Sequence, residues 1–101
     1  MVKLFNKSYN IVYINCHEAA IELNFDITSE DIRTGVILFN VGWSLFSWGE
    51  KFKVAIVSEE PNVTKVELST EAAVQAQIID WGKNDSNVKK FFQNLTQRLS
   101  K

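Results

Sequence analysis

The sequence predicts a single two-layer α+β domain, an antiparallel sheet backed by helices in the order β-α-β-β-β-β-α. Three observations support this fold class. Short runs of alternating apolar residues are typical of strands, the connections between them are short, and two other segments space their apolar residues as helices do. A chain of 101 residues has the usual size of one domain, so we expect residues 1–101 to share one hydrophobic core.

The N-terminal part is predicted to contain a short strand and then a helix. Leu4 and Phe5 lie in the strand, over residues 2–6, and Ser8 stands where an N-cap would accept backbone hydrogen bonds. Residues 11–14 have high strand propensity, but the longer helical period of residues 9–23 favours a helix. The expected buried face comprises Tyr9, Val12, Cys16, Ala19, Ala20 and Leu23.

Four strands are predicted to follow as a meander. They cover residues 25–28, 36–41, 51–58 and 65–68. Nearly every residue of the second run is apolar, so we expect that strand to be central, with both faces covered. The third run alternates in the manner of a strand buried on one side, and the turn at residues 59–62 joins it to its partner. Residues 70–79 fit a helical turn and a continued strand equally well.

The C-terminal segment is predicted to form the helix that covers the sheet. Residues 84–87 offer several N-caps, and apolar residues then recur at helical spacing. These apolar residues are Val88, Phe91, Phe92, Leu95 and Leu99. Two adjacent phenylalanines make a broad apolar stripe, which needs a flat surface such as a sheet. We therefore expect Phe91 and Phe92 to be buried.

Two Trp-Gly steps are the most distinctive local feature of the chain. Each sets a large aromatic side chain beside the residue most able to turn the backbone. We interpret them as structural corners, with Asp80 hydrogen-bonded to the backbone of the second corner or paired with a cation. The corner residues are Trp48, Gly49, Asp80, Trp81 and Gly82.

Residues 34–49 carry no charge and include an aromatic loop. The stretch is too short and too rich in turn residues to span a membrane, which takes about 20 predominantly apolar residues. Two interpretations stay open: its large side chains cap the core, or they face outward and dock a protein or a lipid surface. The side chains concerned are Trp43, Leu45, Phe46 and Trp48.

The predicted element order and the segments Gly42-Trp43-Ser44-Leu45-Phe46-Ser47-Trp48-Gly49-Glu50 and Asp80-Trp81-Gly82-Lys83-Asn84 resemble small bacterial domains of the helix-grip or TATA-binding-protein-like type. The resemblance covers nearly the whole chain. It implies a curved antiparallel sheet crossed by the C-terminal helix, and it implies no catalytic residue. A DNA-binding role is not expected, because the chain is one unduplicated unit without an evident basic sheet face.

Residue types that carry catalysis are scarce. Cys16 and His17 are the only cysteine and histidine, and neighbours on a helix point about 100° apart, which suits no Cys-His pair. We expect Cys16 in the core and His17 at its edge. The carboxylate pairs at residues 30–31 and 59–60 lie in predicted turns, where solvation is the usual state. We therefore expect no enzyme, no metal and no cofactor.

Charge and cysteine usage set further expectations about partners and compartment. A single cysteine forms no internal disulfide, and the N-terminal residues lack the apolar run of a signal peptide, so we expect a cytoplasmic protein. Residues 83–101 carry 5 basic and 1 acidic side chains. We interpret them as the solvated face of a helix, so nucleic acid is not an expected partner.

Two hypotheses for function follow. The first is a non-catalytic binding domain that docks an unknown protein, or a second copy of itself, through the aromatic loop at residues 43–48. The second is a carrier that encloses a small apolar ligand between the sheet and the last helix, lined by Phe52, Val54, Phe91, Phe92 and Leu95. The carrier needs a cavity of about 300 Å³ or more, so a close-packed interior argues against it.

Overall fold

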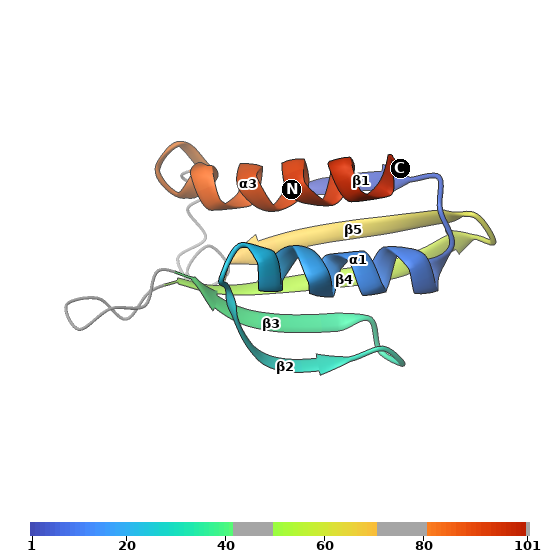
Figure 1. Ribbon diagram of the computed structural model, residues 1–101, viewed down its shortest axis with the longest axis horizontal. Coiled ribbons are helices and arrows are strands. Elements are labelled where there is room, and N and C mark those ends of the chain that lie inside the picture. The colour runs from blue at the N-terminus through green and yellow to red at the C-terminus, as the bar shows by residue number, and fades with distance from the viewer. Residues whose placement is uncertain (42–49, 71–80, 101) are drawn as a thin grey trace.

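The computed structural model describes residues 1–41, 50–70 and 81–100, with side chains for residues 1–41, 51–70 and 87–100. Within these ranges the chain forms an antiparallel sheet with helices packed on it (Figure 1). The elements are β1 (Val2–Phe5), α1 (Tyr9–Glu22), β2 (Asp26–Asp31), β3 (Val36–Val41), β4 (Glu50–Glu60), β5 (Val63–Thr70) and α3 (Trp81–Leu99). The predicted α+β class and element order are confirmed.

The sheet has the strand order β1-β5-β4-β3-β2, and every neighbouring pair is antiparallel. β2 to β5 form the expected meander, and β1 returns to the outer side of β5, where Phe5 pairs with Thr64. The middle strand is β4. β3 therefore lies one position away from the centre that the sequence predicted.

Both helices lie on the same side of the sheet (Figure 1), and one hydrophobic cluster joins them to it. Along β3 the side chains alternate: Ile37, Phe39 and Val41 are buried, whereas Leu38 is 38% exposed. The prediction that both faces of this strand are covered is therefore wrong. Within the described ranges nothing packs on the second face, which we call the open face.

β2 is longer than the sequence predicted. A bulge at Thr28 shifts the register between Ile27 and Ser29, and the strand then stays paired with β3 as far as Asp31. The extra residue re-aims the strand, so that Glu30, expected in a solvated turn, lies opposite Ile37 on the helix-covered side.

Gly35 makes the turn into β3, at a position where any side chain would be strained. Its φ of +76° lies in the left-handed region, and a Cβ at this position would stand 2.2 Å from the carbonyl oxygen of Ile56. Because the two backbone segments lie this close, the Ile56 amide donates a hydrogen bond of 2.8 Å to the Gly35 carbonyl.

The helix α1 matches its prediction closely. Its inward residues Val12, Tyr13, Cys16, Ala19 and Ala20 are buried. Ser8 occupies the N-cap position as expected, but its side chain makes no capping hydrogen bond. Ser8 therefore supplies no side-chain acceptor to the first turn of α1.

The helix α3 begins at Trp81, earlier than the expected start at residues 84–87, so Trp81 and Gly82 belong to its first turn. Its apolar stripe is buried as predicted, with Phe91 and Phe92 both in the core. The ring of Phe39 connects the layers: its centroid lies 5.2 Å from that of Phe25, 5.7 Å from Phe52 and 5.8 Å from Phe91.

Candidate binding surface

Most of the residues that the sequence singled out lie outside the described part of the chain. They are Trp43, Leu45, Phe46, Trp48, Gly49 and Asp80. Trp81 and Gly82 are described only as backbone, in the first turn of α3. The docking role of the aromatic loop and the corner role of the Trp-Gly steps therefore stay predictions.

The ends of β3 and β4 that flank the aromatic segment are paired with each other. Val41 and Glu50 form the last pair of the β3–β4 ladder, and Asn40 and Lys51 form the next pair. The segment that carries Trp43 to Trp48 thus joins the sheet at this end.

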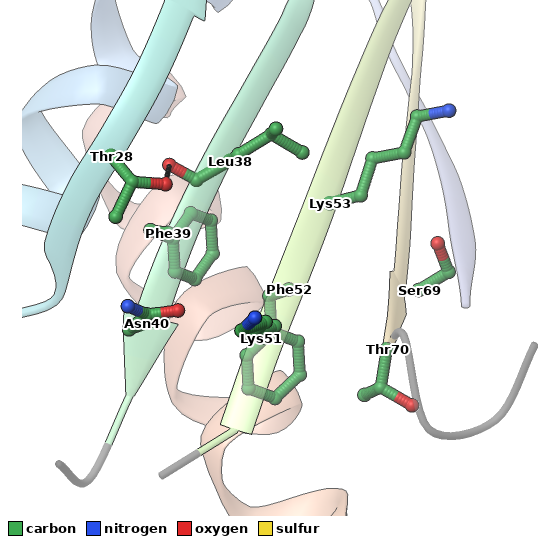
Figure 2. Close-up of a pocket in the computed structure, with 9 residues that line it drawn as sticks. All are labelled: Thr28, Leu38, Phe39, Asn40, Lys51, Phe52, Lys53, Ser69 and Thr70. Atoms are coloured by element: carbon green, nitrogen blue, oxygen red, sulfur yellow. Dashed lines mark hydrogen bonds between the residues drawn. The ribbon is translucent and has the colours of Figure 1, made fainter. Parts of the chain in front are cut away.

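A groove of about 600 Å³ opens on the sheet beside that same end. Figure 2 views it from the open face, with the helices behind the strands. Its lining comes from β2, β3, β4 and β5. Every second residue of a strand points to the same face of the sheet, so the outward side chains of neighbouring strands meet there. The outward lining residues are Thr28, Leu38, Asn40, Lys51, Lys53 and Ser69. The bulged Thr28 donates its hydroxyl to the carbonyl of Leu38, at 3.3 Å.

The described lining of this groove carries positive charge. Lys51 and Lys53 are the charged residues among its described lining, and no carboxylate is among them. The register adds Lys65 to the same face, opposite Val57, where it pairs with Glu59 at 3.4 Å. These lysines share the open face with Asp26 and Glu67, so the expectation that the sheet has no evident basic face is not contradicted.

A second polar cluster joins α1 to β2. The hydroxyl of Tyr13 donates to Oε1 of Glu30 at 3.3 Å, and Nδ1 of His17 lies 3.1 Å from the same oxygen without hydrogen-bond geometry. The hydroxyl of Tyr9 donates to the Ile32 carbonyl at 2.6 Å. Desolvation, followed by the Glu30 carboxylate, raises the pKa of Tyr13 to about 12, so the phenol stays neutral and keeps donating. We interpret this cluster as a clamp that holds β2 against the helix.

Cys16, which precedes His17 of the clamp in the sequence, is not placed to act as a nucleophile. Cys16 is fully buried, and burial raises the pKa of its thiol, so the reactive thiolate is suppressed. His17 is half-buried at the edge of the core, and both residues lie where the sequence placed them. Among the described residues, no three His, Cys, Asp or Glu side chains gather as metal ligands do.

The space between the sheet and α3 is filled with aromatic rings. Phe39 packs between Phe52 and Phe91, and Phe92 meets Phe91 edge to face at 5.7 Å. Phe52, Val54, Phe91 and Leu95, which the carrier hypothesis needs as cavity walls, are buried within this one cluster. Among the described residues, these side chains therefore pack within one apolar cluster.

Comparison with known proteins gives no family assignment: no protein-family model matches the sequence, and no curated protein matches it either. Within the described ranges, neither helix is long and apolar enough to cross a membrane. The function proposed below therefore rests on the groove of the open face.

Proposed function

We propose that this chain is a non-catalytic binding domain, and that it docks a protein partner at the end of the sheet where residues 42–49 join β3 to β4. One observation carries the proposal: a groove of about 600 Å³ lies at that end, on a sheet face that no other described element covers. A sheet with one free face offers a broad docking platform at no cost to the core, which lies entirely on the other side.

The chemistry of the groove favours an acidic partner segment with some apolar side chains. Lys53 attracts carboxylates, and Leu38 offers aliphatic contact between it and β2. The aromatic side chains at residues 43–48 supply further apolar contact in this proposal. A nucleic acid is not the proposed partner, because the described lining of the groove holds two lysines, fewer cations than a phosphate backbone engages.

A defined peptide tests the charge requirement. The probe is a fluorescent 12-residue peptide of alternating Glu and Leu, with a Lys and Leu peptide as its counterpart. We expect only the acidic peptide to bind, and Lys53→Glu to weaken it about tenfold, with stronger binding at low salt. Lys90→Glu, an equal charge change on the exposed side of α3, is the matched control and should bind normally. Equal binding of both peptides, or unchanged binding by Lys53→Glu, contradicts the proposal.

A second experiment tests the aromatic segment in the native setting. The domain is used to capture partners from its own cell extract, alongside Trp43→Ser and Phe46→Ser variants whose folding is checked by circular dichroism. Loss of a partner by a folded variant supports docking. Unfolding of both variants instead favours the interpretation that these rings cap the core.

The carrier hypothesis is the weaker alternative, since its expected lining is packed ring against ring. We also propose kinship with the helix-grip or TATA-binding-protein-like arrangement, which the element order supports. A bacterial origin follows from that kinship. The free thiol of Cys16 supports a cytoplasmic location.

A further inference from the structure

The outward face of α1 is aliphatic where a surface helix is normally polar. Ile11, Ile14 and Ile21 are 48%, 53% and 51% exposed. With Glu18 they occupy positions i, i+3, i+7 and i+10, the spacing of the contact seam in paired helices. At 100° per residue, this seam points directly away from the buried face of α1.

The isoleucines of the seam have no role in folding that the structure reveals. The core contacts of α1 come from its other side, through Val12, Cys16 and Ala19. Isoleucine is among the residues most often buried, and contiguous exposed aliphatic side chains usually mark an interaction site. Of the strand-like run at residues 11–14, which competed with the helix prediction, Ile11 and Ile14 belong to this second apolar face, whereas Val12 and Tyr13 are buried.

The charges of α1 are divided unevenly between its halves. Residues 9–16 carry no charge, and Ser8 gives the helix start no side-chain cap. Glu18 and Glu22 both lie in the second half, near the negative end of the helix dipole. Glu22 pairs with Arg98 of α3, whereas no described residue forms an ion pair with Glu18.

We propose that two copies of this chain associate through α1, with the two helices antiparallel about a twofold axis. In the register that keeps all four seam positions in contact, Ile11 packs on Ile21 of the second copy, and Ile14 on the stem of Glu18. The acidic half of each helix then faces the uncharged half and positive dipole end of the other. A parallel pair would instead set Glu18 against Glu18, so the charges select the antiparallel arrangement.

The contact is modest in size. A helix of 14 residues is about 21 Å long, so the interface is smaller than the standard size of about 800 Å² per partner. We therefore expect a reversible dimer that dissociates on dilution.

Sedimentation equilibrium of the full chain, from about 10 µM to about 1 mM, tests the association. We expect Ile21→Lys to raise the dissociation constant on the order of 100-fold, since the twofold axis removes two buried isoleucines at once. Lysine also suits the last turn of a helix, so folding is retained. The matched control is Val2→Lys, which changes a side chain that is 54% exposed on the open face opposite Glu67.

Three results would overturn the dimer: a wild-type monomer at every concentration, an unchanged Ile21→Lys protein, or equal dissociation by Val2→Lys. Orientation is tested by mixing Ile11→Cys and Ile21→Cys proteins under mild oxidation, with the buried Cys16 as a silent thiol. An antiparallel pair gives the mixed disulfide. Homodisulfides alone would show a parallel pair and refute the proposed arrangement.

Discussion

Replacing Phe39 by alanine tests the one-sided sheet most directly. Its ring is buried at the point where β3 meets β2, β4 and α3, and it stacks on Phe25, Phe52 and Phe91. Truncation of a buried phenylalanine costs about 3–5 kcal/mol in total, and this total includes the lost ring contacts, which are worth about 0.5–1.5 kcal/mol per pair. With three ring neighbours the upper end applies, so we expect a loss of about 5 kcal/mol.

The neighbouring residue Leu38 is the internal control. It lies on the same strand but points to the open face, and it is 38% exposed. Alanine there leaves little cavity, since solvent already reaches the side chain, and we expect a loss of about 1 kcal/mol or less. The two substitutions thus differ by about 4 kcal/mol, although they are one residue apart.

Urea unfolding followed by circular dichroism at 25 °C measures both values. A domain of this size has a total stability of roughly 5–15 kcal/mol, so Phe39→Ala risks complete unfolding. Phe39→Leu, with an expected loss of about 1–2 kcal/mol, then gives the comparison in a folded protein. A loss of about 3 kcal/mol or more for Leu38→Ala would refute the reasoning, because a cost of that size is typical of a leucine truncated in a covered core.

Two further predictions concern the turn and the clamp. Gly35→Ala should cost about 2–4 kcal/mol by the same urea assay, because a Cβ there meets the Ile56 carbonyl at a φ of +76°; a loss under about 1 kcal/mol would show that the turn adapts freely. The neutral phenol of Tyr13 stabilises the folded state below pH 10, and this contribution is lost as pH rises toward its folded pKa of about 12. Tyr13→Phe should therefore flatten the decline in unfolding free energy between pH 10 and pH 12, and an unchanged decline contradicts the role assigned to Glu30.

The elements that the sequence predicted best are those with a clear periodicity. In α3 two adjacent phenylalanines, Phe91 and Phe92, require a wide apolar contact, and the sheet supplies it. In α1 the step of three or four residues outweighed the strand propensity of residues 11–14. Both helices buried most of the side chains that the spacing indicated, whereas Tyr9 and Leu23 are partly buried.

The errors arose where a pattern depends on the rest of the molecule. An apolar run such as Val36–Val41 does not reveal whether a second layer exists, and here the helices share one side. The extension of β2 depends on a single bulged residue, Thr28, which leaves no periodic signal. The groove was not predicted for a similar reason, because Leu38 and Ser69 meet the lysines of β4 only through strand register.

The placement of both helices on one side of the sheet sets α1 and the groove on opposite sides of the molecule. In the dimer proposed above, the two grooves therefore point outward, away from each other. Such an assembly is bivalent, and a partner that displays two acidic segments would gain avidity from rebinding, whereas a partner with one segment would not. Weak individual contacts then suffice for selective capture of clustered or repeated targets.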